Sequence, residues 1–448
     1  MTITTDSPTP RTLRRWLASF TALAAVGFAA TPAHAVPAFA RQTGQDCIAC
    51  HVGGFGPQLT PFGRAFKLGG YTLSNGKKHL PVSAMLVSSY THTTNDVTPN
   101  ADYHGEHAND NLVALQQASV FLAGRISDHV GMFGQATYEQ ATYSPNFNWD
   151  NTDIRYAHDY QFGSTSGVFG VSLNNNPTVS DVWNTVPAWQ FGFMSAPIGG
   201  GYGTSPMIAN LGQSVIGTTA YTLIDNHWYF EGGLYHGISN WWNQQLKGGG
   251  ADAVSGYNPY WRVNYSGYAG NANYEAGLIG MNTKVDDGTG SGATNSFKDV
   301  GIDASYQYID GGISSVTVNG LYMHERQNYT PGFVGAGTSS NASDNLNFFN
   351  LNTAYWYQNT YGATIQFFNT TGSGDAALYG TDPSGAALSP NTSGVVWELD
   401  WNPFGKSWVD PEKNLRLGLQ YTTYNKFAGS SNGASGNNSL YVYLWTAI

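Results

Sequence analysis

Charged side chains are scarce in this chain of 448 residues. Asp, Glu, Lys and Arg make up 11% of it and aromatic residues 14%, whereas charged residues reach about 25% in a typical soluble domain. Long apolar runs are also missing, because beyond residue 35 none approaches the ~18 residues of a membrane-spanning helix. The composition argues against a charged soluble surface and against a helical membrane protein. It is typical of a transmembrane β-barrel, in which only alternate residues face lipid.

Apolar and polar residues alternate with the period of a β-strand in several stretches. The clearest are residues 118–126 and 130–138, which flank a polar turn, and residues 300–308 and 316–322, which flank a turn at Asp310. Tyrosines at the ends of such stretches are typical of the aromatic girdles of a membrane barrel. The alternation predicts antiparallel hairpins with one face toward lipid and the other toward a polar lumen.

The predicted fold is therefore all-β, a transmembrane antiparallel β-barrel over residues 80–448. At roughly 20–25 residues for each strand with its connection, this stretch has room for about 14 to 18 strands, and we expect about 16. A soluble β-sandwich or propeller would also alternate, but the low charge and the mixture of short turns with long polar loops favour a barrel. The long loops are expected at residues 248–258, 283–295, 332–345 and 371–392.

Cysteine is almost absent, and its placement is specific. The only two cysteines, Cys47 and Cys50, are separated by two residues and followed directly by His51. This spacing is the attachment signature of a c-type haem, in which two thiols add to the vinyl groups and the adjacent imidazole ligates the iron. A strained short disulfide, a dithiol redox site and a zinc site, which would need two further ligands, explain the pattern less well. The sequence predicts one covalently bound haem c, provided that the chain is exported.

Export is indicated by the first 35 residues. Arg11, Arg14 and Arg15 precede an apolar stretch over residues 16–30, and a small-x-small motif follows at residues 33–35. This order is that of a secretory signal peptide. The apolar stretch is short for a transmembrane helix of ~20 residues, although a retained anchor is the alternative. We predict a signal peptide over residues 1–35 and a location in the bacterial cell outer membrane.

The remainder of the chain is acidic. Removing three arginines and Asp6 from 19 basic and 29 acidic residues leaves 16 and 28, a formal net charge of −12. Apart from outer-membrane lipid around the barrel, this balance argues against nucleic acid or anionic lipid headgroups as partners. It suits a cationic partner, such as a basic periplasmic cytochrome or a metal ion.

Residues 36–79 carry the haem signature but are too few to enclose a porphyrin. A segment of this size is near the lower limit for folding without a staple. The economical arrangement places this short, mainly helical and loop segment in the barrel lumen, where the wall completes the haem pocket. The segment would then plug the channel that a barrel of this size otherwise encloses. Phe121, which we expect to face the lumen, suits such packing.

The residues around the signature resemble a known family. Residues 37–44, the signature itself and residues 57–71 are similar to the fused outer-membrane cytochrome–porins, whose best-known members oxidise Fe(II) outside the cell. The resemblance implies a monohaem segment fused to a porin barrel that takes electrons from extracellular Fe(II). They would pass to a periplasmic cytochrome or copper protein. Fe(II) as the donor comes from this resemblance and not from the composition.

A second axial ligand is expected, because electron transfer is best served by a six-coordinate iron. Met and His are the usual choices, and Met raises the potential. Residues 36–78 contain no Met and no His other than His51, so the ligand must come from the linker or the barrel. Met85, expected to face the lumen in the first strand, is the first choice, and His79 is the second. The alternative is a lumen-lining Met85 with no bond to iron.

An extracellular loop is expected over residues 94–111 if the first strand runs outward. Its carboxylate and imidazole groups could bind Fe(II) transiently on its way inward. The candidates are Asp102, His104, Glu106, His107 and Asp110. A solvated polar loop is the simpler interpretation.

The leading interpretation is an outer-membrane oxidoreductase that oxidises Fe(II) by outer-sphere electron transfer. This chemistry needs no acid–base or nucleophile constellation, and the sequence offers no catalytic residues of that kind. One alternative is a substrate-specific porin in which the haem is a plug or sensor. Another is a conduit that sends electrons outward to metal acceptors.

Overall fold

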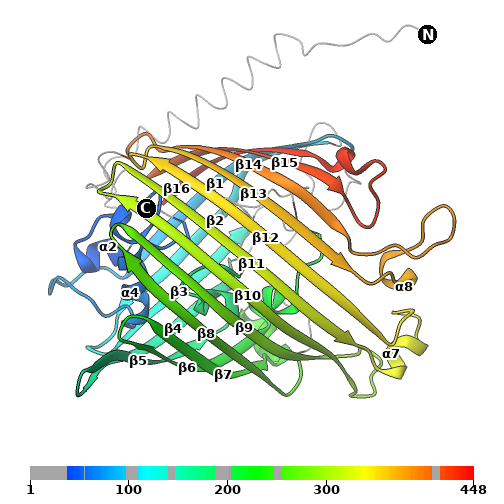
Figure 1. Ribbon diagram of the computed structural model, residues 1–448, viewed down its shortest axis with the longest axis horizontal. Coiled ribbons are helices and arrows are strands. Elements are labelled where there is room, and N and C mark those ends of the chain that lie inside the picture. Colours follow the sequence, from blue (N-terminus) through cyan, green and yellow to red (C-terminus); the bar gives the residue numbers. More distant parts are fainter. Residues whose placement is uncertain are drawn as a thin grey trace, which may run out of the picture.

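The computed structural model of the chain describes residues 38–54, 56–96, 109–139, 147–186, 201, 203–246, 254–405 and 414–447. Sixteen strands in these ranges form one closed antiparallel barrel (Figure 1). Each strand pairs with its neighbours in sequence, and the first strand pairs with the last. The predicted all-β barrel and its strand number are confirmed. The predicted signal peptide lies outside the described residues.

The strands and helices have the following bounds. The strands are β1 Val82–Thr93, β2 Asp110–Arg125, β3 Val130–Glu139, β4 Phe147–Phe162, β5 Thr165–Asn174, β6 Val215–Ile224, β7 Trp228–Gly237, β8 Tyr257–Ala269, β9 Ala272–Asp286, β10 Thr294–Asp310, β11 Ser314–Asn328, β12 Ser343–Tyr357, β13 Tyr361–Gly372, β14 Thr392–Trp401, β15 Leu415–Lys426 and β16 Ser439–Ala447. The helices are α2 Ala38–Thr43, α3 Cys47–Cys50, α4 Pro61–Leu68, α5 Pro177–Ser180, η2 Met207–Asn210, α6 Asn240–Leu246, α7 Pro331–Gly335, α8 Ala376–Tyr379 and η4 Ala434–Asn437.

The barrel wall is apolar outside and polar inside. On β10, Val300 and Ile302 are 52% and 55% exposed on the outer face, whereas Asp299 and Asp303 are each 1% exposed on the inner face. Because every backbone group in a closed barrel finds a partner within the wall, such a structure can cross a bilayer. With its apolar outer face, this barrel has the architecture of a bacterial outer-membrane protein. No helix in the described ranges is long and apolar enough to cross a membrane.

Connections are short at one end of the barrel and long at the other. Residues 163–164 and 270–271 are complete turns, whereas α7 and α8 lie in long connections at the opposite end (Figure 1). The loop expected at residues 283–295 is shorter than predicted, because β9 continues to Asp286 and β10 begins at Thr294. In barrels of this kind the short turns face the periplasm and the long loops face outward.

The described residues of the connection between β5 and β6 fold into the barrel, a feature that we did not predict. We call its described parts, residues 175–186 and 203–214, the lumen loop. Val179, Ile208 and Leu211 in this loop are 4%, 0% and 0% exposed. The lumen therefore holds a second insertion besides the haem-signature segment.

Candidate haem site in the barrel lumen

The haem signature forms one helical turn followed by a return loop. In α3 the backbone N–H of His51 donates to the Cys47 carbonyl oxygen at 2.9 Å. His51 then pairs with Leu59 in an isolated antiparallel bridge, and the Thr60 N–H donates to the Cys50 carbonyl oxygen at 2.9 Å. The three signature residues are thus fixed by backbone contacts among residues 47–51 and with residues 59–60.

Helix α4 packs directly on this turn. Thr60 caps the helix by accepting a hydrogen bond from the Gly63 N–H at 3.1 Å, and Pro61 occupies the first turn, where its missing N–H costs nothing. A Cβ at Gly63 would lie 2.3 Å from the Cys50 carbonyl oxygen. Glycine is therefore required here for the close approach of α4 to the cysteines.

Three aromatic rings form a small core within the segment. Phe39 lies edge-on to Phe66 at 5.0 Å between ring centroids and stacks on Tyr71 at 5.2 Å. Gln42 joins the two ends of the segment, since its Nε2 donates to the carbonyl oxygens of Tyr71 and Leu73, both at 2.7 Å. We call residues 38–54 and 56–79 the plug segment.

The plug segment is bonded to the inner wall of the barrel close to His51. The Gly53 carbonyl oxygen accepts hydrogen bonds from Asn402 Nδ2 at 2.8 Å and from Arg416 Nη2 at 3.0 Å. The Arg416 guanidinium lies over the rings of Trp356 and Trp445, at 4.7 and 5.5 Å from their centroids. These contacts tie the loop after the haem signature to strands β12, β15 and β16.

The opposite side of the plug segment is held in the same way. Tyr71 donates to Asp153 Oδ2 on β4 at 2.7 Å, and the Leu68 carbonyl oxygen accepts from the Tyr221 hydroxyl on β6 at 2.6 Å. Gln307 Nε2 on β10 donates to the Leu59 carbonyl oxygen at 3.2 Å. The prediction that this segment sits in the lumen is confirmed, and it lies at the short-turn end.

The donor groups fit a c-type haem. Cys47 and Cys50 are free thiols, and burial raises the pKa of each to about 11. Burial lowers the pKa of His51 to about 4, which keeps its imidazole neutral, the form that binds iron. His51 Nδ1 is buried and has no hydrogen-bond partner in the described ranges. The cavity beside the ring, bordered by Ile48 and Trp356, measures about 50 Å³ and is too small for a porphyrin, so the fit concerns the donor groups and not the space around them.

The two candidate distal ligands lie in different places. Met85 faces the lumen at 8% exposure, as predicted, in a cluster with the aromatic side chains of β16 against which Ile48 and Phe121 pack. Met85 is thus near the haem-signature turn but does not line the cavity beside His51. His79 lies at the edge of the plug segment and forms a 2.9 Å hydrogen bond with Asn75. Ligation by either residue stays a prediction.

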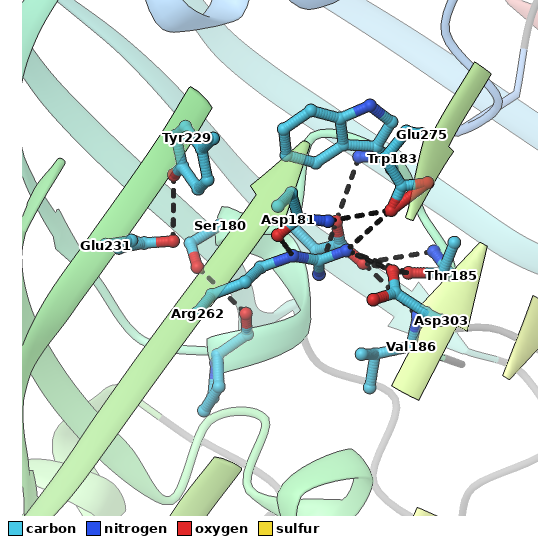
Figure 2. Close-up of polar contacts among 12 residues, drawn as sticks. Ser180, Asp181, Trp183, Thr185, Val186, Tyr229, Glu231, Arg262, Glu275 and Asp303 are labelled. Carbon is cyan, nitrogen blue, oxygen red and sulfur yellow. Dashed lines mark hydrogen bonds and ion pairs between the residues drawn. The ribbon is translucent and has the colours of Figure 1, made fainter. Parts of the chain in front are cut away.

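The lumen loop is fixed by a buried charged cluster (Figure 2). Arg262 on β8 pairs with Asp181 of the loop at 2.8 Å and also with Asp303 on β10, and all three side chains are fully buried. Its guanidinium lies 5.3 Å from the ring centroid of Trp183. Asp181 also accepts backbone hydrogen bonds from Trp183 and Thr185 at 2.9 and 3.0 Å. The Arg262–Asp181 ion pair therefore ties this loop to the wall, and Asp303 holds the same guanidinium from β10.

The two insertions meet inside the barrel. Lys67 of α4 donates from Nζ to the carbonyl oxygens of Val179 and Asp181 in the lumen loop. Asn184 donates from Nδ2 to the Pro57 carbonyl oxygen. Burial lowers the pKa of Lys67 to about 8. The plug segment and the lumen loop thus form one connected unit.

A vestibule of about 700 Å³ lies at the long-loop end. Its wall combines η2 of the lumen loop with Glu325 and Gln327 of β11 and with Phe333 and Tyr379 from the long connections. Glu325 accepts a 2.6 Å hydrogen bond from the backbone N–H of Met207 in η2. The vestibule floor is therefore the lumen loop itself.

The expected Fe(II)-binding loop can be compared with the structure only at Asp110. Asp102, His104, Glu106 and His107 lie outside the described residues. Asp110 accepts from the Tyr90 hydroxyl at 2.8 Å and pairs with His92 Nδ1 at 2.6 Å. Within the described ranges no three His, Cys, Asp or Glu side chains come together to hold a metal ion.

Comparison with known proteins finds likeness at the level of the barrel. No family model and no curated protein matches the chain. A loop-deletion form of OmpT from Vibrio cholerae matches 82% of this chain and 98% of its own, at 9% identity and a TM-score of 0.45. OmpF of Salmonella typhi, in complex with daunomycin, matches 82% and 97%, at 12% identity and 0.45. The outer-membrane channel DcaP of Acinetobacter baumannii matches 82% and 96%, at 11% identity and 0.44.

Proposed function

We propose that this chain is an outer-membrane electron-transfer protein. It holds one c-type haem on Cys47, Cys50 and His51, takes electrons from extracellular Fe(II) and passes them to a cationic periplasmic carrier. The observation that carries the proposal is the seat of the haem-signature segment inside the lumen, bonded to the inner wall. A segment that served only as a plug would need neither two cysteines at this spacing nor the histidine that follows them.

A bound c-type haem would supply one-electron redox chemistry, with a potential tuned by its axial ligands and surroundings. The chain's part is to hold and insulate that group. The two thiols would anchor it and His51 would ligate it. Asn402 and Arg416 fix the Gly53 carbonyl, two residues beyond His51. This restraint would limit the movement of His51 when the charge of the haem iron changes, which favours electron transfer.

The location of the plug segment suits transfer of electrons to a carrier in the periplasm. The segment lies at the short-turn end, which faces the periplasm in barrels of this kind. The formal net charge of −12 after residue 35 favours a basic carrier through electrostatic attraction. The vestibule lies at the other end, where a donor arriving from outside would meet the protein. The hydrocarbon layer between the two ends is about 30 Å thick, and a single haem does not span it, so either the donor enters the lumen or the periplasmic carrier docks into its mouth.

The first test asks whether haem is attached and through which residues. The full-length protein is purified from outer membranes, and its mass and absorption spectrum are compared with those of a Cys47→Ala/Cys50→Ala variant. We expect the mass of one haem in the wild type and its loss in the variant. His51→Ala should keep the covalent haem but change its spectrum. A wild-type chain without haem mass would reject the proposal.

The second test asks what reduces the haem. Anaerobic titration of the oxidised wild-type protein with Fe(II) should reduce the haem with about one electron per chain. Transfer to a basic soluble cytochrome should follow and should weaken as salt screens the charges. Absence of reduction by Fe(II) would reject Fe(II) as the donor while leaving the haem assignment intact.

A second candidate function is that of a haem-plugged, substrate-specific porin. The vestibule of about 700 Å³ and the porin-like barrel favour it. Conductance in a planar bilayer separates the two, because an electron-transfer protein needs no open path for ions. Substantial conductance together with a haem that Fe(II) does not reduce would favour the porin. A low midpoint potential would instead favour a conduit that sends electrons outward to metal acceptors.

A further inference from the structure

Four basic side chains gather on the outer wall of the barrel at the long-loop end. Lys284 on β9, Lys298 on β10, and His324 and Arg326 on β11 are all exposed and all occupy outward positions of their strands. Lys298 and Arg326 lie directly opposite each other in the β10–β11 ladder. Lys284 lies opposite Ser296, two residues before Lys298. We call these four residues the basic cluster.

The basic cluster borders the apolar band of the barrel. Val300, the next outward residue on β10, is 52% exposed and lies opposite His324. Tyr322 on β11 and Ile302 on β10 continue the band at 45% and 55% exposure. Because outward residues two positions apart are separated by about 7 Å along a strand, the cluster lies one step beyond the hydrocarbon. This is the level of the lipid headgroups in the outer leaflet.

The lysines and the arginine of the basic cluster form no ion pair in the described ranges. Like charges placed directly opposite in a sheet repel each other, and Lys298 and Arg326 are such a pair. The carboxylates beside them on β10 and β11 point into the lumen. Asp286, two residues beyond Lys284, accepts a hydrogen bond from the Gly288 N–H and forms no ion pair with the cluster.

Neutral side chains of β12 hold part of the cluster in position. Arg326 donates from Nη1 to Asn345 Oδ1 at 3.1 Å and from Nη2 to Ser343 Oγ at 2.8 Å. His324 Nδ1 forms a 2.8 Å hydrogen bond with Asn347 Oδ1. These contacts fix the direction of both side chains and give Arg326 only neutral partners, so the cluster is prepared for an anion from outside the protein.

We propose that the basic cluster binds the phosphate groups of an outer-leaflet membrane lipid. Guanidinium and ammonium groups are the usual partners of phosphate, and the apolar band directly below would receive the acyl chains of the same molecule. The negative charge of the whole chain led us to argue against anionic headgroups as partners. That argument fails locally, because Asp299 and Glu325 beside the cluster lie inside the barrel, and Asp286, which follows Lys284 on the outer face, forms no ion pair with the basic residues.

The test measures phosphorylated lipid that stays bound to the full-length protein after extraction in mild detergent. The variant is Lys298→Gln/Arg326→Gln, and the matched control is Lys426→Gln, on β15 and outside the cluster. Because two charge-assisted contacts are lost, we expect the variant to retain about tenfold less phosphorylated lipid than the wild type. The control should retain the wild-type amount. Heat-modified mobility on a gel confirms folding, and Lys298→Gln alone replaces the double variant if that fails to fold.

Add-back experiments distinguish the source of the phosphate. Delipidated protein receives vesicles of one lipid with its headgroup either phosphorylated or dephosphorylated, or inorganic phosphate alone. The proposal expects the thermal midpoint to rise with the phosphorylated lipid only, and to rise less in the double variant. An equal rise with the dephosphorylated lipid would assign binding to the apolar band and overturn the proposal. An equal rise with inorganic phosphate would also overturn it, in favour of a free-phosphate site.

Discussion

Gly53 offers the sharpest test of how the plug segment is seated. Its φ is +67°, and a Cβ added to it would lie 2.4 Å from Trp356 Cε2 on the barrel wall. Its carbonyl oxygen is the one that Asn402 and Arg416 hold. Gly53→Ala therefore adds a methyl group at the point where the loop after the haem signature meets the wall.

The expected destabilisation has two parts. An L-residue in the left-handed region costs about 1–2 kcal/mol, and an extra methyl group in a packed site costs about 1–3 kcal/mol. Together they weaken the docked state by about 2–5 kcal/mol. Since about 1.4 kcal/mol is tenfold in an equilibrium, the undocked population should rise between roughly 30-fold and several thousand-fold.

Gly76→Ala is the matched control. Gly76 has a similar φ of +78°, but a Cβ there would meet nothing within 4 Å. Gly76→Ala has the cost of the left-handed backbone conformation but no contact with Trp356, so it should destabilise the docked state by about 1–2 kcal/mol. The difference between the two variants isolates the contribution of close packing to the wall.

Trypsin cleavage of the full-length protein in detergent measures the undocked population. Arg64 is 7% exposed, and Lys67 is bonded to the lumen loop, so cleavage after either residue requires undocking. When opening is fast relative to cleavage, the rate follows the population of the open form. Since the two variants should differ by about 1–3 kcal/mol, Gly53→Ala should be cleaved about 5- to 140-fold faster than Gly76→Ala. Equal rates for the two variants would refute the role of the Trp356 contact.

Three further predictions concern the lumen. Burial lowers the pKa of Lys67 in the folded protein to about 8, from an ordinary value of 10.5. Between these two pH values the folded protein binds fewer protons than the unfolded chain, so the stability that depends on Lys67 should rise with pH. A thermal melt of Lys67→Met should show a flatter dependence on pH in this range. Arg262→Met leaves buried carboxylates unpaired and should cost about 3–5 kcal/mol in unfolding experiments, whereas Arg125→Met, at an exposed pair, should cost about 0–1 kcal/mol. Met85→Ala should abolish an iron–sulfur absorption band and lower the midpoint potential, while Met281→Ala, another buried methionine, should change neither; an unchanged band in the first variant would exclude Met85 as the ligand.

The barrel was predictable because its physical cause is local. Apolar and polar residues alternate because the wall has lipid on one side and a polar lumen on the other, and the pattern can be detected in each strand separately. The pattern failed at residues 283–295. There β9 and β10 extend beyond the bilayer, so polar residues such as Lys284 replace apolar ones on the outer face while the backbone ladder continues.

The lumen loop was not predictable in this way. Its burial depends on Arg262, which pairs with Asp181 across about 80 positions of sequence and with Asp303 on another strand. Such a contact leaves no periodic signal in either segment. A signal that was present is the alternation on β10, which places Asp303 on the lumen side, where a charged residue must find a partner or water.

Haem attachment stays a prediction from three residues at fixed spacing, whereas the place of those residues in the barrel could not be predicted from the sequence pattern. Gly53 meets Trp356, Asn402 and Arg416, all about 300 or more positions away.

These distant contacts bear directly on function, because the plug segment joins the lumen loop through Lys67, and both insertions occupy the lumen. Transport of a solute would require this unit to move aside, whereas electron transfer needs no atom to pass. If Gly53→Ala raises ion conductance while Fe(II) still reduces the haem, the packed lumen serves to block solutes and electron transfer does not depend on it. If conductance rises and reduction is lost together, the seat of the plug segment also sets the position of the haem.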